Sequence, residues 1–490
     1  MRNHTFILSL SVIFSTFSFF STETFSQANS KDAYIIKGKI KGWKDTVCYF
    51  GNNYGDKKYV KDTTRIDKNG NFVFKGKEKL PGGMYLIIFP NKVYYEIIID
   101  KEQDFYTETD TADFVKNMKI KGSEDNIQFY KYLNFISEKQ KEAEPMRKRI
   151  AKLRGDTVTV ITKKDSIKII QDKLTAIDKD VMNYHDDFSK KHPDSFQSVI
   201  FKANKDPVVP ETPTLPNGRK DSLFPYLYYK KHYWDNISLT DDRLLRTPIF
   251  HAKLKNYFDN VILQHPDSII KESDILIDKA STNKELFKYI IWYVTGTYET
   301  SPIMGMDAVF VHEVEQYYIT KKAFWVDSIN IQKIVHRGML LKPLLLEKPC
   351  PPVIMQDTLD KNISLYEVKS KYIVLIFWDP DCGHCQKIVP KLKEIYDKTL
   401  KAKGVTVYAV ESADLDAKWK KFISDHQLNW INVHDKYKTY FLHDMFDIYS
   451  TPVIYLLDEN KRIKAKRIDV EQLDGFIDHL EKIKTSEKKK

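Results

Sequence analysis

The sequence predicts a multidomain α+β protein, in which a small antiparallel β domain, an all-α middle domain and a C-terminal α/β domain follow one another. Apolar and polar residues alternate over residues 32–122, as in strands with one buried face. Helical spacing dominates residues 123–345, and strands alternate with helices over residues 346–490. A chain of 490 residues is also too long for a single core, so several domains are expected.

The first residues have the layout of a secretory signal peptide, predicted to cover residues 1–27. Arg2 precedes an apolar run over residues 6–20, and the small-residue stretch near Ser26 offers a cleavage site. The run contains serines and threonines and is short for a spanning helix, although an uncleaved membrane anchor is the alternative. We therefore expect a protein exported to the periplasm, where disulfides persist.

Strand signals fill residues 32–122. The segment YIIKGKIKGW alternates in polarity, and Asn69-Gly70 is a hairpin signal between Ile66 and Phe72. The segments GGMYLIIF and VYYEIIID follow as further strands. These patterns predict an antiparallel arrangement of short strands.

Helical periodicity begins after Ser123, a residue type that caps helices. A proline-rich stretch, residues 205–218, interrupts it. The tetrapeptide His-Pro-Asp-Ser occurs at 192–195 and at 265–268, and we expect the same N-cap chemistry both times. Apolar residues in steps of three and four then predict a longer helix: Ile167, Ile170, Leu174, Ile177 and Val181. We expect this helix to pair with the segment around Ile150 as an antiparallel hairpin.

The formal charge of +11 comes from 78 Lys and Arg against 67 Asp and Glu, spread along the chain. Nucleic-acid binding proteins carry basic stripes interleaved with aromatic residues, and this chain has none. The sequence therefore predicts a solvated basic surface and no nucleic-acid partner, with weak attraction to acidic partners or membrane surfaces as the alternative.

Two of the four cysteines, Cys382 and Cys385, lie in the segment CGHC. The apolar strand YIVLIFW leads into it, so Cys382 is expected to open a helix, where the helix dipole stabilises a thiolate and lowers its pKa. Cys385 follows one turn later and is expected to lie deeper, close enough to form a disulfide with Cys382. Thiol–disulfide exchange needs an exposed attacking thiolate and a second thiol that resolves the mixed disulfide.

Charged neighbours are expected to tune this pair. Protonated His384 favours the thiolate and makes the pair more oxidising. Asp379 and Asp381 act in the opposite direction, because nearby carboxylates oppose a thiolate. For the two aspartates, the alternative interpretation is solvated helix-cap residues.

The sequence does not indicate metal binding or proteolysis. A structural zinc site needs four ligands, and the chain has no second CxxC. A purely structural disulfide over this spacing would constrain little of the unfolded chain. The segment HEVEQ starts like a metalloprotease helix, but Gln316 stands where a second His is required, so His312 and Glu313 are expected to be ordinary helix residues. We expect no metal and no cofactor.

These residues resemble the thioredoxin superfamily, and in particular the exported TlpA/ResA-like thiol-disulfide oxidoreductases of bacteria. The resemblance covers about residues 346–485 and implies a thioredoxin-like fold for the C-terminal domain. It rests on Phe377-Trp378, Cys382-Gly383-His384-Cys385, Pro390 and Thr451-Pro452. The regions before residue 346 look like the β and helical domains that precede such domains in some exported bacterial proteins.

The resemblance also implies roles for single residues. Cys382 would be the nucleophile and Cys385 the resolving thiol of a redox-active disulfide. Pro452 would be a cis-proline beside that disulfide, and the Thr451 backbone would pair with a substrate strand, with Trp378 also in the substrate-binding set. The implied partners are disulfide-containing client proteins and, for a reductase, a membrane thiol electron donor.

Some positions differ from such relatives. Ile376 stands where many thioredoxins carry a buried acid, Ile388 stands where cytochrome-maturation reductases often carry a Glu, and Asp381 replaces a frequent Trp. Loss of both acids argues against their proton-handling route and against cytochrome c maturation. The Gly383-His384 pair is similar to that of disulfide isomerases, and the peroxiredoxin pattern fits neither cysteine.

The leading hypothesis is an exported oxidoreductase that reduces or isomerises disulfides in client proteins. The alternative is a binding or assembly protein whose N-terminal domains hold a partner, with the thioredoxin fold as a scaffold. Cys48 and Cys350 are expected to be buried or isolated. Their alternatives are an interdomain disulfide or, for Cys350, a third thiol near the active site.

Overall fold

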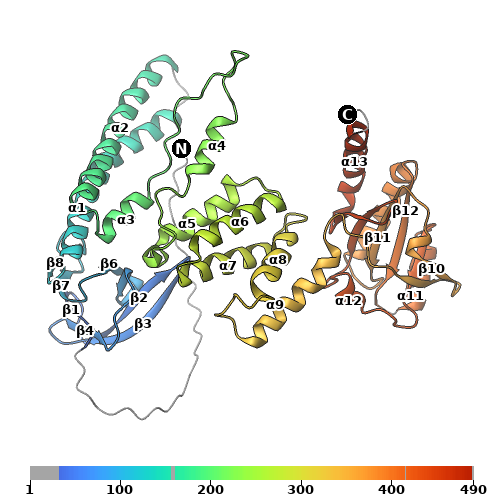
Figure 1. Ribbon diagram of the computed structural model, residues 1–490, viewed down its shortest axis with the longest axis horizontal. Helices are drawn as coiled ribbons and strands as arrows, with labels where there is room; N and C mark the ends of the chain where they lie inside the picture. The colour runs from blue at the N-terminus through green and yellow to red at the C-terminus, as the bar shows by residue number, and fades with distance from the viewer. Residues whose placement is uncertain (1–31, 156–159, 414, 488–490) are drawn as a thin grey trace, which may run out of the picture.

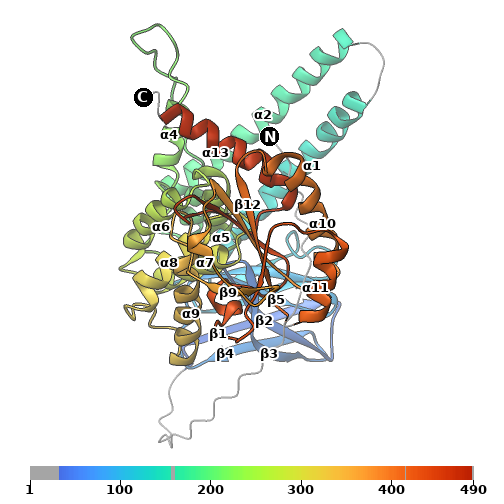
Figure 2. The ribbon, with the colours of Figure 1, turned by 90° about the vertical axis from the view of Figure 1, so that its right-hand side faces the viewer.

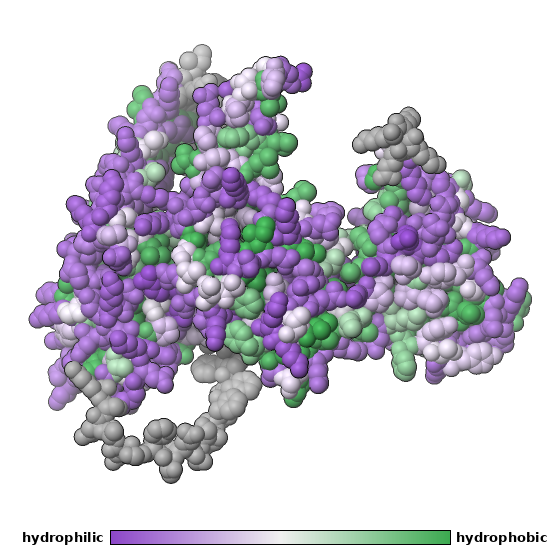
Figure 3. Space-filling view, viewed as in Figure 1, coloured by the Kyte–Doolittle hydropathy of each residue, from purple (hydrophilic) through white to green (hydrophobic). Residues whose placement is uncertain are grey.

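The computed structural model describes residues 32–155, 160–413 and 415–487, and the expected signal peptide lies outside this part of the chain. A region of β-sheets, a helical region and a C-terminal domain built around a larger sheet follow one another (Figure 1). Within the described residues, no helix combines the length and the apolar character needed to cross a membrane. On the face in Figure 3, hydrophilic residues are spread over all three regions.

Eight strands form two four-stranded sheets in the N-terminal region, in the orders β4-β1-β7-β8 and β3-β2-β5-β6. Aromatic and aliphatic side chains from both sheets, among them Phe50, Phe74 and Tyr85, pack into one core. The strands are β1 (Tyr34–Lys41), β2 (Thr46–Tyr54), β3 (Lys57–Ile66), β4 (Asn71–Gly76), β5 (Gly83–Ile88), β6 (Tyr94–Ile99), β7 (Asp104–Asp110) and β8 (Lys119–Lys121).

This region is not wholly antiparallel, because β1 pairs with β7 in parallel. The tight turn expected at Asn69-Gly70 is present, and the Asp67 N–H donates to the Asn71 carbonyl at 2.9 Å. The turn does not close a hairpin, however, since β3 pairs with β2 whereas β4 pairs with β1 in the other sheet. A turn motif fixes local geometry, but the choice of partner strand depends on distant residues.

The middle region is helical and contains α1 (Glu124–Gly155), α2 (Val160–Lys191), α3 (Phe196–Ala203), α4 (Phe224–His232), α5 (Pro248–Asn256), α6 (Pro266–Ala280), α7 (Lys284–Glu299), α8 (Asp307–Glu313) and α9 (Ser328–Leu341). Helices α1 and α2 form the predicted antiparallel hairpin, which projects from the rest of the molecule (Figure 1). Lys139 on α1 pairs with Asp180 on α2 at 2.7 Å.

Two capping predictions had different outcomes. The Asn126 N–H donates to the Ser123 hydroxyl at 3.3 Å, so Ser123 caps α1 as expected. The repeated His-Pro-Asp-Ser segments do not use one chemistry: Ser195 caps α3 through its hydroxyl, whereas His265 caps α6 through its ring nitrogen. The helix starts one residue after Ser195 in the first copy, but directly at Pro266 in the second.

The C-terminal domain contains a seven-stranded mixed sheet in the order β10-β9-β13-β12-β11-β14-β15. The strands are β9 (Ile354–Asp357), β10 (Asn362–Ser364), β11 (Tyr372–Trp378), β12 (Val405–Glu411), β13 (Ile431–His434), β14 (Val453–Asp458) and β15 (Ile463–Lys466). The helices are α10 (Cys385–Ile395), α11 (Asp416–Asp425), α12 (Leu442–Met445) and α13 (Leu473–Glu487).

Both faces of this sheet are covered. Every residue of β11 is buried, and alternate side chains enter two different clusters. Val374 and Trp378 pack with residues of α10, α11 and α13, and Figure 2 shows α10 and α11 together beside the sheet. Phe377 enters the opposite cluster, which also holds Cys350. This continuous burial explains why the sequence of β11 is apolar on both faces.

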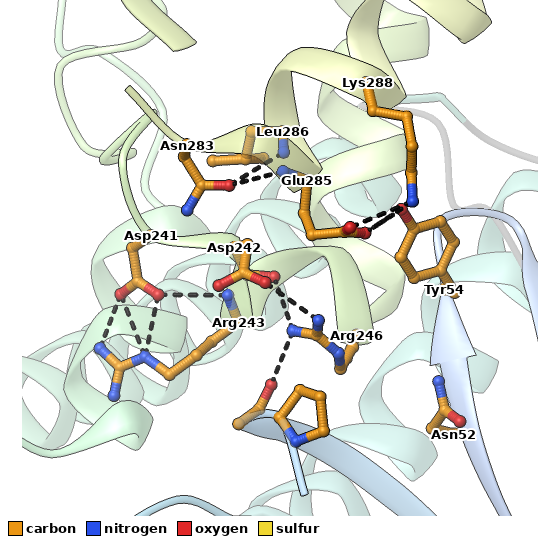
Figure 4. Close-up of polar contacts among 12 residues, drawn as sticks. Asn52, Tyr54, Asp241, Asp242, Arg243, Arg246, Asn283, Glu285, Leu286 and Lys288 are labelled. Carbon is orange, nitrogen blue, oxygen red and sulfur yellow. Dashed lines mark hydrogen bonds and ion pairs between the residues drawn. The ribbon is translucent and has the colours of Figure 1, made fainter. Parts of the chain in front are cut away.

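A partly buried polar network joins the β region to the helical region (Figure 4). It centres on the short helix η2 (Asp242–Arg246). The Arg246 guanidinium donates to the Gly82 carbonyl at 3.1 Å and pairs with Asp242 at 2.9 Å. The Tyr54 hydroxyl on β2 donates to Glu285 on α7 at 2.7 Å. These contacts fix the first two regions against one another.

Candidate functional site

The CGHC segment lies between the central strand β11 and helix α10. The helix begins at Cys385, three residues later than the sequence predicted. Cys382 lies in the preceding turn, and its carbonyl accepts a hydrogen bond from the Gln386 N–H at 3.0 Å. Cys382 therefore lies just before the helix start, where the backbone N–H groups of His384 and Cys385 favour negative charge on its sulfur.

Cys382 is the accessible and more acidic thiol of the pair. Its side chain is partly exposed, and its Sγ donates to the Thr451 carbonyl at 3.3 Å. Burial by itself raises the pKa of Cys382, but hydrogen bonds with Thr451 and with the backbone of Cys385 and His384 outweigh it and lower the pKa. A lowered pKa increases the thiolate fraction available for attack.

Cys385 has the opposite character. Its side chain is completely buried against the α10 face of the sheet. Burial raises the pKa of the Cys385 thiol to about 12. The Asp379 N–H lies 3.5 Å from its sulfur. Of the two thiols, Cys382 ionises first and Cys385 stays protonated.

The loop before β14 closes the site on its other side. The Thr451–Pro452 peptide bond is cis, as the resemblance implied. Val453 follows directly and pairs with Phe377 of β11, which places this loop beside the end of the strand that leads to the cysteines. The contact between Cys382 and the Thr451 carbonyl is a consequence of this strand pairing.

The two aspartates near the cysteines have partners of their own. Asp381 pairs with Lys418 of α11, so its negative charge is partly balanced. The Asp379 carboxylate accepts a hydrogen bond from the Asp381 N–H at 2.7 Å and shapes the loop. Neither aspartate caps α10, because its N-cap is His384, which makes no side-chain capping bond.

Trp378 cannot contact a client directly. The side chain is fully buried, and its ring lies 5.0 Å from the ring of Phe422. The resemblance implied a substrate-binding role for Trp378, and this burial does not agree with that role. Trp378 instead packs in the core beside the start of the CGHC loop.

Sequence reasoning missed several charged residues around the site, of which Glu411 and Asp447 are buried. Glu411 ends β12 opposite Trp378 and is 3% exposed, and its carboxylate accepts hydrogen bonds from the backbone that leads into α11. Asp447, Arg467 and Arg337 form an ion-pair cluster near the cis-proline loop. A buried charge has no local sequence pattern, and Arg337 comes from another region of the chain, so no motif could have found them.

His312 and Glu313 of the HEVEQ segment are helix residues of α8, as expected. Glu313 on α8 is fully buried and accepts a hydrogen bond from the Ser273 hydroxyl at 3.0 Å. Burial raises the pKa of Glu313 to about 8. His312 pairs with Asp274 at 2.9 Å. Within the described residues, no group of three or more His, Cys, Asp or Glu side chains is arranged to hold a metal ion.

Comparisons with known families divide the chain in three. Residues 346–466 match the AhpC/TSA family. Residues 34–129 and residues 164–342 match two families that are described only as domains of unknown function, DUF4369 and DUF5106.

The curated relatives are similar over about a quarter of the chain. The thiol-disulfide oxidoreductase ResA of Bacillus cereus is 27% identical over 136 residues, which cover 27% of this chain and 77% of that protein. ResA of Bacillus subtilis is 28% identical over 116 residues, which cover 24% of this chain and 63% of that protein.

Solved structures from other bacteria also resemble this chain. A domain of a possible thiol-disulfide isomerase from Cytophaga hutchinsonii is 44% identical, with a TM-score of 0.28 over 29% of this chain and 98% of that one. A thioredoxin-like protein from Bacteroides caccae is 20% identical, with a TM-score of 0.43 over 54% of this chain and 96% of that one.

Proposed function

Because its C-terminal domain is a thioredoxin-like domain of the AhpC/TSA family and its curated relatives are thiol-disulfide oxidoreductases, we propose that this enzyme is exported and reduces or isomerises disulfides in client proteins. The observation that carries the proposal is the asymmetry of the CGHC pair. Cys382 is partly exposed with a lowered pKa, and Cys385 is buried beside it with a raised one. Thiol–disulfide exchange requires these two roles, an accessible thiolate that attacks and a second thiol that resolves the mixed disulfide.

The proposed reaction has two steps. The Cys382 thiolate attacks one sulfur of a client disulfide, which forms a mixed disulfide and releases the other client sulfur as a thiolate. Cys385 then loses its proton and attacks the Cys382 sulfur, which closes the Cys382–Cys385 disulfide and releases the second client thiol. A membrane thiol donor would return the two electrons. In isomerisation, the released client thiolate attacks the mixed disulfide instead and restores Cys382.

The remaining residues have supporting roles in this proposal. The Thr451 backbone and cis-Pro452 border the nucleophile, and an extended client segment would pair with the Thr451 backbone. His384 is exposed at the start of α10 and would favour the thiolate when protonated. Asp381, paired with Lys418, would oppose the thiolate less than an unpaired carboxylate does.

The reduction potential of the pair tests the direction of transfer. The full chain is equilibrated in glutathione buffers and its thiols are trapped. A value near about −180 mV, as in disulfide isomerases, would favour isomerase or oxidant work, whereas a value near about −270 mV, as in thioredoxin, would favour a reductase with a dedicated donor. A pair that does not exchange at all would overturn the proposal.

A binding or assembly role for the N-terminal regions is the second candidate. A cleft of about 300 Å³ in the helical region favours it, lined by Lys230, Lys231 and Lys279 together with Trp234 and Tyr257. One acid, Glu272, also lines it and pairs with Lys230, which leaves Lys231 and Lys279 as the excess positive charge. A basic, aromatic cleft of this kind suits an acidic partner segment. A partner is first captured with the wild-type chain. Its recovery by the full chain with both Cys382 and Cys385 replaced by Ser would support this role, and loss of its recovery would refute it.

A further inference from the structure

The segment before the cis-proline is held by two arginines. Asp447 lies between α12 and β14, and its side chain is 6% exposed. Arg467, just after β15 in the same domain, pairs with this carboxylate at 2.7 Å. Arg337 reaches it from α9 of the helical region and contacts both carboxylate oxygens, the second at 3.3 Å. A buried carboxylate needs such compensation, because an unpaired charge away from water is costly.

The backbone around Asp447 is tightly constrained. Its φ of 53° is a left-handed conformation that few non-glycine residues adopt, and it persists only where the surroundings hold it. The Arg467 guanidinium donates to the Asp447 carbonyl at 2.8 Å, and the Tyr455 hydroxyl donates to the Phe446 carbonyl at 2.7 Å. The Ile448 N–H donates to the His443 carbonyl at 2.9 Å.

Arg337 extends this anchorage toward the active site. Its guanidinium donates to the Tyr449 hydroxyl at 3.3 Å and lies 5.2 Å from the centre of the Tyr449 ring. Tyr449 is two residues before Thr451, whose carbonyl contacts the Cys382 sulfur. Contacts therefore run from α9 to Asp447 and Tyr449, and the backbone joins Tyr449 to Thr451 beside the nucleophile two residues later.

We propose that Arg337 is a positioning residue for the redox centre: by holding Asp447 and Tyr449, the helical region sets where Thr451 lies relative to the Cys382 sulfur. This inference rests on the proposed function. It gives the DUF5106 region a role in the chemistry of the C-terminal domain, beyond carrying that domain. A partner that moves α9 would then change the reactivity of Cys382.

The helical region and the C-terminal domain share a second ionic contact. The effect of Arg337 on the loop can therefore be separated from its effect on the docking of the domain. Lys466 on β15 pairs with Asp307 on α8 and donates to the Leu344 carbonyl at 2.8 Å. This contact remains when Arg337 is replaced, so loss of Arg337 is expected to loosen the loop without detaching the domain.

The test uses the full chain with its cysteines reduced. Iodoacetamide alkylation of Cys382 is followed across pH, with mass spectrometry of the Cys382 peptide so that Cys48, Cys350 and Cys385 do not contribute. In Arg337→Gln, we expect the pH of half-maximal rate to move upward and the rate at neutral pH to fall at least about fivefold. The reason is that the Thr451 side chain, whose hydrogen bond with Cys382 lowers the pKa of the thiol, is no longer held in place.

Two further variants separate positioning from a simple loss of positive charge. The double variant Arg337→Gln/Asp447→Asn has the same net charge as the wild type but lacks the ion pair. We expect it to stay slow. Lys342→Gln removes a charge just beyond α9 whose partner, Glu315, is also in the helical region. We expect it to behave as the wild type. The other charged or titratable groups near Asp447 or Cys382 are unchanged: Arg467, Lys466, His443, Asp379, Asp381, Lys418 and His384.

A wild-type pH profile in Arg337→Gln would overturn the proposal. So would recovery of the wild-type profile in the double variant, or an equal shift in Lys342→Gln, because either result would indicate an effect of charge alone. If Arg337→Gln does not fold, Arg337→Lys replaces it. Lysine keeps the charge but not the two-pronged contact, so a smaller upward shift supports the proposal and an unchanged profile overturns it. The alkylation assay needs no client disulfide, so a failure of the proposed exchange activity is distinguished from a failure of positioning.

Discussion

At the level of single residues, the two thiols of the CGHC pair predict different consequences of replacement. Cys382→Ser removes the accessible nucleophile, so we expect disulfide reductase activity toward insulin to fall at least about a thousandfold. Cys385→Ser leaves the attack intact but removes the resolving thiol, so we expect a mixed disulfide with the client to accumulate. Non-reducing gels and intact-protein mass spectrometry would detect it.

Cys48→Ala is the matched control for these variants. Cys48 is buried in the core of the N-terminal β region, away from the CGHC pair, and its loss is expected to leave the rate of insulin reduction unchanged. Full activity in Cys382→Ser, or no mixed disulfide in Cys385→Ser, would contradict the assignment of the two thiols.

Glu313 predicts a pH dependence of stability that has nothing to do with the redox centre. Burial raises its pKa from 4.5 to about 8 in the folded protein. Between these values the folded state holds a proton that the unfolded state has released, so the free energy of unfolding falls as pH rises through this range. We expect Glu313→Gln to flatten this part of the profile and to raise the stability of the helical region at about pH 8 by a few kcal/mol.

Thermal unfolding between about pH 5 and pH 9 measures this effect. Glu315→Gln is the control, since Glu315, two residues further along the chain, is a partly exposed acid that pairs with Lys342. An unchanged slope in Glu313→Gln would mean that another group dominates the pH dependence.

At the level of elements, the sequence predicted what depends on neighbouring residues. The α1–α2 hairpin, the cap at Ser123 and the fully buried strand β11 follow from spacing and residue type. Pairing over long distances was not predictable. The turn at Gly70 is local, but whether β4 joins β3 or β1 depends on Gly38, where the ring of Phe72 occupies the space of a Cβ. Similarly, a shared tetrapeptide caps α3 through Ser195 but α6 through His265, so four identical residues do not fix where a helix starts.

The network around η2 predicts that one arginine holds two regions together. Arg246 has 8% of its side chain exposed and bridges Asp242 and the Gly82 carbonyl. Arg246→Ala leaves both partners without a donor inside the interface, so we expect the free energy of unfolding to fall by about 3 kcal/mol. Urea denaturation measures the change, and Arg65→Ala, at an exposed arginine of β3, should alter it by less than about 0.5 kcal/mol.

At the level of the whole molecule, the candidate site was only partly visible in the sequence. The cysteines and the cis-proline have a motif, so Cys382, Cys385 and Pro452 were identified. Arg337 was not, because it lies more than a hundred residues before Asp447 and meets it only through the docking of two regions. The contribution of the helical region to the site is therefore a property of the assembled fold.

The distribution of the four thiols over the assembled fold leads to the last prediction. Cys48 lies in the core of the N-terminal β region and Cys350 in the core of the C-terminal domain, so neither can reach the other without unfolding. Burial raises the pKa of each to about 12. We therefore expect mild oxidation to produce one disulfide per chain, between Cys382 and Cys385, and to leave two thiols that react with maleimide only in denaturant. Peptide mapping under non-reducing conditions decides the matter. A Cys48–Cys350 bridge in the native protein would mean that the two cores open or exchange, and it would also undermine the rigid docking on which the role of Arg337 depends.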